Sequence, residues 1–166
     1  MIFFGHLNDM LRQKMPAFDF KNPTMDPLEL TQTLIREMKN NNGIGLAANQ
    51  LGIQARVFVI YTDPPMVCFN PKITNYSQEE VLLDEGCLSY PGTAVKVKRP
   101  KHIRVRFQDP YGNIVTKKFT GMAARAFQHE MDHLDGIEYF QRANTFHMER
   151  FKRKWKKTVR KVKKAS

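Results

Sequence analysis

Residues 121–136, GMAARAFQHEMDHLDG, limit most strongly what this chain can fold into. Small and apolar residues run through the segment as far as Gly136, which predicts a helix that ends at this glycine. The same helix carries His129, Glu130, Asp132 and His133 in its second half. Unpaired polar groups are costly to bury, so these side chains need partners. The segment therefore predicts a largely apolar helix with a polar site along one side.

The polar residues of this helix form an H-E-x-x-H motif. On a helix, residues i and i+4 lie about 40° apart around the axis, so His129 and His133 can bind one ion from the same side. Glu130 lies about 100° from His129 and can reach the open position of that ion. The motif predicts a catalytic metal site with the two histidines as ligands and Glu130 as its acid/base.

A catalytic metal ion also needs a third protein ligand and an open position for water. Glu138, His147 and Glu149 follow the motif in the sequence and are candidates. Cys87 is another, because a thiolate beside two imidazoles suits Zn²⁺ or Fe²⁺. Alternatively, Cys87 is a small buried apolar residue, the role that we expect for Cys68 in the strand-like segment MVCFN.

The remaining sequence predicts strands in the middle and helices at both ends. Asp26 and Pro27 favour the start of a helix over residues 25–40. Residues 44–54 are expected to form a loop, and Thr145–Val162 a final helix. Period-two patterns and turn residues predict strands within 56–62, 66–76, 79–85, 93–98, 102–109 and 113–120, with a hairpin turn at 109–113. This order favours an α+β fold: short antiparallel sheets packed around a central metal-binding helix, with an N-terminal helix and a basic C-terminal helix.

The net charge of +11 is concentrated at the C-terminus. Residues 147–166 contain ten basic residues and one acid, whereas the preceding 146 residues carry a net charge of only +2. We therefore predict a hydrolase domain over 1–146 and a basic amphipathic helix over 147–166. The apolar stripe of that helix would consist of Met148, Phe151, Trp155, Val159 and Val162.

The basic helix has several possible roles. Its charge would attract phosphate backbones without sequence preference, so it could bind an RNA-rich surface such as the ribosome. Alternatively, the stripe packs on the domain and the charges are simply solvated. A helix lying on a membrane surface or a calmodulin-like target has a similar pattern.

Two cysteines do not make a disulfide framework, and the start MIFFGHLNDM has no basic region or cleavage site of a signal peptide. No apolar run approaches the roughly 20 residues that span a bilayer. We expect a protein of the cytoplasm or an organelle matrix that is not secreted and has no membrane partner.

Three segments resemble the three signature motifs of the peptide deformylases, in the same order. They are GIGLAANQ at 43–50, EGCLS at 85–89 and QHEMDH at 128–133. Leu11-Arg12, Pro16 and Phe18-Asp19 are similar to the family's opening segment. The resemblance covers roughly residues 7–141, and three motifs in order are far more specific than H-E-x-x-H alone.

The resemblance implies a metal-dependent hydrolase that removes the formyl group from N-formylmethionine at the start of nascent polypeptides. Cys87, His129 and His133 would hold one divalent ion, with Fe²⁺ expected natively and Zn²⁺ or Ni²⁺ possible in purified protein. The side chain of Gln50 and the backbone N–H of Leu88 would form the oxyanion hole beside Glu130. The residues expected to bind substrate are Gly43, Ile44, Gly45, Gly86 and Met122.

Two other functions fit part of the sequence. A metallopeptidase also uses H-E-x-x-H, but the Cys87 and Gln50 motifs argue against it. A nucleic-acid-binding module would use the basic helix and a structural metal, which normally needs four protein ligands. Arg125 precedes His129 by one turn, and we expect its side chain to extend to solvent in preference to contacting substrate.

Overall fold

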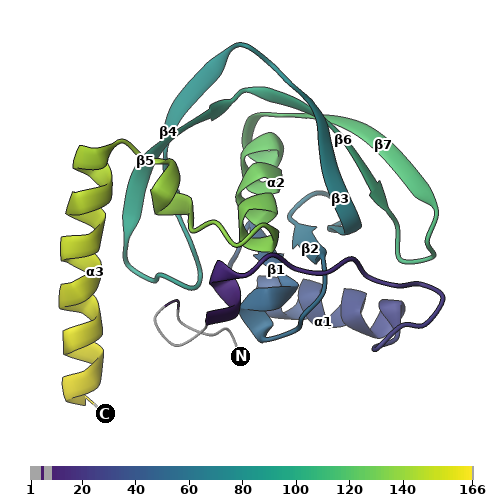
Figure 1. Ribbon diagram of the computed structural model, residues 1–166, viewed down its shortest axis with the longest axis horizontal. Helices are drawn as coiled ribbons and strands as arrows, with labels where there is room; N and C mark the ends of the chain where they lie inside the picture. The colour runs from purple at the N-terminus through teal and green to yellow at the C-terminus, as the bar shows by residue number, and fades with distance from the viewer. Residues whose placement is uncertain (1–4, 6–8, 166) are drawn as a thin grey trace.

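The computed structural model describes Gly5 and residues 9–165, with side chains described as far as residue 161. Three α-helices are present in this part of the chain: α1 (Pro27–Asn40), α2 (Gly121–Leu134) and α3 (Thr145–Ala165). Three short 3-10 helices accompany them: η2 (Asp9–Arg12), η3 (Ala48–Leu51) and η4 (Tyr139–Arg142). Together with short antiparallel sheets they form a mixed helix and sheet fold, as the sequence predicted (Figure 1).

The described residues form seven strands in two antiparallel sheets. The larger sheet has the order β1-β2-β3-β6-β7, with strands β1 (Gly45–Ala47), β2 (Val57–Ile60), β3 (Met66–Tyr76), β6 (His102–Gln108) and β7 (Ile114–Thr120). The smaller sheet is the hairpin of β4 (Glu80–Gly86) and β5 (Ala94–Pro100). The predicted turn between β6 and β7 is present, because the Asp109 carboxylate accepts hydrogen bonds from the backbone N–H groups of Tyr111 and Asn113.

Helix α1 covers one part of the outer face of the large sheet. Its N-cap is Asp26, whose carboxylate accepts hydrogen bonds from the N–H groups of Leu28 and Glu29 at 2.7 and 2.9 Å. Its apolar stripe of Leu30, Leu34 and Met38 packs in a cluster with side chains of β1, β2 and the first half of β3. The predicted helix and its cap are thus confirmed.

Helix α2 lies between the two sheets (Figure 1). Every residue from Ala124 to Leu134 is buried. On the side of the large sheet, Phe127 packs edge-on against Phe58 of β2 with ring centroids 4.8 Å apart, and it also contacts Phe119 of β7. The opposite side of the helix faces the β4–β5 hairpin and carries the polar residues.

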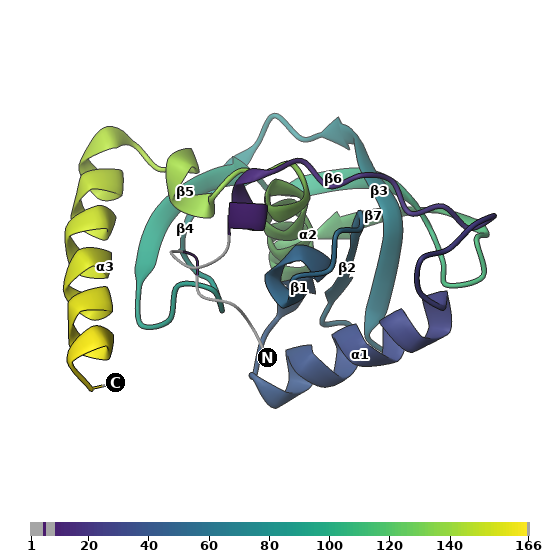
Figure 2. The same ribbon diagram turned by 60° about the horizontal axis from the view of Figure 1, so that its bottom comes forward.

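Helix α3 runs along the outside of the molecule beside the β4–β5 hairpin (Figures 1 and 2). Phe151 is buried and stacks on Phe140 of η4 with ring centroids 4.3 Å apart. Trp155 packs edge-on against Tyr90 at 5.0 Å. The expected apolar stripe therefore packs on the domain from Met148 to Trp155, while the side chain of Val162 lies outside the described residues.

The prediction of a loop over 44–54 was wrong. Gly45–Ala47 forms β1 and pairs with β2, and residues 48–51 form η3. A three-residue strand is too short to show a period-two pattern, and all three residues are buried, so no alternation exists to detect. Among the helices of the described chain, none combines the length and the apolar character that a bilayer crossing requires.

Candidate active site

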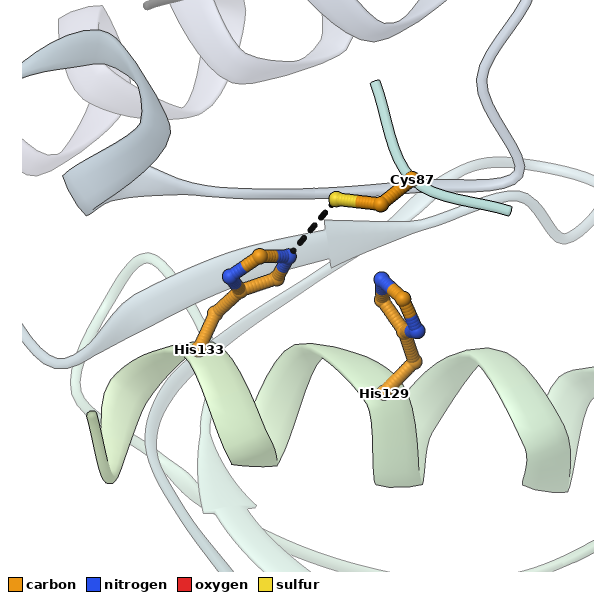
Figure 3. Close-up of side chains that lie close together, drawn as sticks. All are labelled: Cys87, His129 and His133. Carbon is orange, nitrogen blue, oxygen red and sulfur yellow. Dashed lines mark hydrogen bonds between the residues drawn. The ribbon is translucent and has the colours of Figure 1, made fainter. Parts of the chain in front are cut away.

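Three side chains with metal-binding atoms meet where α2 faces the end of the β4–β5 hairpin. His129 and His133 extend from the same side of α2, one turn apart, towards Cys87, which follows β4 (Figure 3). The sulfur of Cys87 lies 3.2 Å from Nε2 of His133, and one ligand atom of each residue lies within 4.8 Å of the others. The alternative that Cys87 is only a small core residue does not explain this convergence. Cys68 is fully buried in the apolar core, as expected.

The ring of His129 is oriented by Glu85. Nδ1 of His129 lies 3.1 Å from a carboxylate oxygen of Glu85, so this nitrogen carries the proton and Nε2 is left for a ligand. Burial alone would raise the pKa of Glu85, but hydrogen bonds from His129 and Arg99 lower it well below its usual value. Burial lowers the pKa of His133, which favours the neutral imidazole that a metal ion requires.

Arg125 forms part of the same buried network, and the expectation that it extends to solvent was wrong. It is only 6% exposed. Its guanidinium donates to Glu85 at 2.8 Å and to the carbonyl oxygens of Val97 and Val81 at 2.9 and 2.5 Å. The sequence did not reveal this role because its partners are 28 to 44 positions away. Arg125 thus joins α2 to both strands of the hairpin.

Arg99 of β5 makes a second connection between the hairpin and α2. It donates two hydrogen bonds to Glu85 at 2.6 and 2.9 Å and one to Asp132 of α2 at 2.8 Å. Asp132 also accepts from Arg142 of η4 at 2.7 Å. Sequence reasoning assigned no role to Glu85, Arg99 or Asp132. The sequence offered one signal for these contacts: acidic side chains on a largely apolar helix need hydrogen-bond or charge partners when they are buried.

The amide of Gln50 is fixed with its NH₂ group towards the cysteine. Its oxygen accepts a hydrogen bond from the backbone N–H of Ala47 at 2.9 Å. Its nitrogen therefore points the other way, 3.0 Å from the hydroxyl oxygen of Ser89 and 3.6 Å from the sulfur of Cys87. A buried, oriented amide donor thus lies beside the three side chains whose ligand atoms converge. Leu88 stands between Cys87 and Ser89 and belongs to the same segment.

Glu130, the residue that follows His129, is also buried. One of its carboxylate oxygens has no hydrogen-bond partner in the described structure, and burial is the main cause that raises its pKa to about 7. The backbone of Gly45 passes directly over the carboxylate: a Cβ atom at this position would lie 2.4 Å from the Oε1 atom of Glu130. Only glycine fits there without displacing the acid.

The residues expected to bind substrate lie on, or next to, the elements that carry these side chains. Gly43 and Ile44 precede β1, which is an edge strand of the large sheet, and Ile44 is 52% exposed. Gly86 immediately precedes Cys87 and is exposed. Met122 lies in the first turn of α2 and is 57% exposed. An edge strand beside the acid is suited to pairing with an extended peptide.

A cluster of one half-buried cysteine and two buried histidines, an acid with one unpartnered carboxylate oxygen and an oriented amide donor define the class of metal-dependent hydrolases. Comparisons with known proteins identify the family within that class. A sequence profile of the polypeptide deformylases matches residues 4–149. A peptide deformylase of Thermodesulfovibrio yellowstonii is 41% identical over 155 residues, which cover 90% of this chain and 92% of the relative.

Solved structures agree with the sequence comparison. The structure of peptide deformylase 1B from Arabidopsis thaliana matches with a TM-score of 0.88 and 28% identity, covering all of this chain and 94% of the plant chain. That of the Thermotoga maritima enzyme matches with a TM-score of 0.80 and 34% identity over 87% of this chain and 97% of the other. The chain belongs to the peptide deformylase family, whose activity is the metal-dependent removal of the formyl group from N-formylmethionine of nascent peptides.

Proposed function

We propose that Cys87, His129 and His133 hold the metal ion with which this chain deformylates nascent peptides. The observation that carries the proposal is the convergence of one thiol and two imidazoles within 4.8 Å. Zinc–sulfur and zinc–nitrogen bonds are about 2.3 and 2.1 Å long, so a single ion can reach all three atoms. The remaining position would be left for water, next to Glu130.

We propose Fe²⁺ as the native ion, with Zn²⁺ or Ni²⁺ as alternatives in purified protein. The mixed set of one sulfur and two nitrogen donors is borderline in softness and accepts all three ions. Glu85 stabilises the ligand arrangement, because the hydrogen bond that it accepts from His129 fixes the tautomer and the orientation of the imidazole ring.

In the proposed reaction, Glu130 accepts a proton from the attacking water and passes it to the nitrogen of the methionine that leaves. When bound, the ion supplies water with a pKa lowered from 15.7 towards ~7. The amide of Gln50 and the N–H of Leu88 donate hydrogen bonds to the formyl oxygen as it becomes negative. One such donor is worth about 3–4 kcal/mol in the transition state.

The free edge of β1 would bind the nascent peptide in an extended conformation. The backbone of Gly43, Ile44 and Gly45 would pair with the substrate, and Gly86 would line the opposite side. The exposed side chains of Ile44 and Met122 would contact the methionine. Both side chains are more than half exposed, so they are available to a ligand.

We also propose that the chain consists of a hydrolase domain, residues 1–146, and a basic helix, residues 147–166. The basic helix would dock the enzyme on the ribosome. Phe151 anchors this helix on the domain. Exposed basic side chains, which include Arg153, Lys154, Lys157 and Arg160, cover its remaining surface. The inferred substrate emerges from the ribosome, so docking there would bring the site to new chains early. We place the enzyme in the cytoplasm or an organelle matrix, in keeping with its two free cysteines.

Charge substitution tests the docking better than truncation does, because removal of α3 would expose the apolar cluster beneath Phe151. Replacement of Arg153, Lys154, Lys157 and Arg160 by Gln should remove salt-sensitive co-sedimentation with ribosomes and preserve turnover of a short formyl-Met peptide. Unchanged co-sedimentation would exclude α3 as the docking element.

The catalytic proposal is tested by formate release from anaerobically purified protein. Formyl-Met-Ala-Ser should release formate, whereas the acetylated twin should not react and the unmodified peptide should not be cleaved. Metal analysis should give one divalent ion per chain. Cleavage of the unmodified peptide would instead support the metallopeptidase, and a metal-loaded protein without activity would support a structural metal site.

A further inference from the structure

The outer face of the large sheet is only partly covered. Helix α1 packs over β1, β2 and the first half of β3, where Val59 and Phe69 belong to its apolar cluster. The strand pairing of β3 is irregular after Phe69. The rest of the outer face is formed by the second half of β3 together with β6 and β7. Four basic side chains occupy this uncovered part: Lys72, Arg104, Arg106 and Lys118.

The strand register places these four side chains on one face. Ile103 and Val105 of β6 are buried beneath the sheet, so Arg104 and Arg106 point to the opposite side. Lys72 of β3 is paired with Arg106, and Lys118 of β7 is paired with Arg104. Neighbouring strands are about 5 Å apart, and alternate residues on one strand are separated by about 7 Å. Strands β3, β6 and β7 are neighbours in the sheet (Figure 1), so the four cations form a compact array across three strands.

The array has no counter-charge within the described structure. Each of the four side chains is exposed, and no ion pair or hydrogen bond joins any of them to a described acid. Other lysines nearby in sequence behave differently: Lys96 pairs with Asp84, Lys98 with Glu80 and Lys101 with Glu79. Like charges directly opposite one another on adjacent strands repel, so the sheet gains nothing from this arrangement by itself.

We propose that this array, Lys72, Arg104, Arg106 and Lys118, is a binding surface for the phosphate backbone of RNA. A single small anion is held by donors that converge in a pocket, whereas these cations are spread over an exposed sheet face. A polymer with regularly repeated phosphates can contact several of them at once. RNA is the polyanion that an enzyme acting on nascent chains encounters where those chains emerge. The surface is separate in sequence and in structure from α3, so it would give the enzyme a second contact with RNA.

The test measures binding of a labelled oligouridine to the full chain by fluorescence anisotropy at several salt concentrations. One variant carries Lys72→Gln, Arg104→Gln, Arg106→Gln and Lys118→Gln. The matched control removes the same number of charges from basic residues that have acidic partners and lie outside α3: Arg36→Gln, Lys96→Gln, Lys98→Gln and Lys101→Gln. All of these positions are exposed, so both variants should keep the fold and the formate-releasing activity.

For single-stranded RNA, each phosphate contact contributes about 0.7 to the slope of log K against log salt, so loss of the array should reduce that slope by about 3. The control should reduce it by less than 1. Equal losses in both variants would show that only net charge matters and would overturn the proposal. Unchanged RNA binding combined with lost binding to phosphatidylglycerol vesicles would also overturn the proposal, because it would assign the surface to a membrane.

If the four-site variant does not fold, two double variants are compared separately: Arg104→Gln with Arg106→Gln, and Lys72→Gln with Lys118→Gln. Each should show half the effect. Because α3 is intact in every variant, a negative result leaves the docking role of α3 untouched.

Discussion

Replacement of Arg125 by Met tests whether the buried network holds the two halves of the metal site together. The site is divided between α2, which carries both histidines, and the hairpin that leads to Cys87. Arg125 connects them through Glu85 and through the carbonyl oxygens of Val81 and Val97. Met preserves much of the volume of Arg125 but none of these hydrogen bonds.

The magnitude follows from what the substitution leaves behind. Removing one partner of a buried ion pair costs about 3–5 kcal/mol. Glu85 keeps its two hydrogen bonds from Arg99, so the cost should be near the lower limit, about 3 kcal/mol, with two carbonyl groups left unpaired. For a domain of this size, that corresponds to a fall of about 6–12 °C in Tm. Metal affinity should fall about tenfold, as is typical when groups behind the ligands are lost.

Thermal unfolding of the metal-free protein and competition with a metal chelator measure the two effects separately. Arg56→Met is the matched control, because Arg56 also pairs with a carboxylate, Asp135, at 2.8 Å but has no connection to Glu85. The control should lower stability without changing metal affinity. If Arg125→Met is no more destabilising than Arg56→Met and binds metal as tightly as the unmodified protein, the network does not position the site.

The remaining predictions concern individual side chains of the centre. Cys87→Ser should lower metal content and formate release together, whereas Cys68→Ser should leave both nearly unchanged; the reverse pattern would assign the ligand to Cys68. Gly45→Ala should reduce kcat while metal content stays at one ion per chain, because the added methyl group displaces Glu130; full activity would contradict the close approach seen here. Gln50→Glu should lower kcat by about 10²-fold or more with KM little changed, since it places a negative charge beside the formyl oxygen; an unchanged kcat would remove Gln50 from the oxyanion hole.

Local chemistry made much of the fold predictable. The cap at Asp26, the hairpin turn at Asp109 and the alternation of the strands each depend on neighbouring residues, and each is present. Strand β1 was missed because it consists of three buried residues followed directly by a 3-10 helix, and so short a segment carries no periodic signal. The convergence of Cys87 with the histidines could be expected only from the resemblance, because spacing alone left Glu138, His147 and Glu149 open as ligands.

The partners of the buried charges could not be read from the sequence. Arg125 and Glu85 are 40 residues apart, and only the packing of the hairpin against α2 brings them together. An arginine on a helix usually extends to solvent, which favoured the wrong interpretation. The sequence was also ambiguous about α3. Its amphipathic pattern was clear, but the same pattern occurs in a helix that packs on its own domain and in a helix that binds a partner. The burial of Phe151 shows the packing.

The most direct test of the central claim is the metal content and formate release of Glu130→Gln, measured on the same anaerobic preparation. Gln has nearly the same shape as Glu but cannot accept the proton of the attacking water. If Cys87, His129 and His133 bind the ion and Glu130 is the acid/base, the variant should retain one divalent ion per chain and lose about 10²-fold or more in kcat. A metal-loaded variant that releases formate at the unmodified rate would contradict this account.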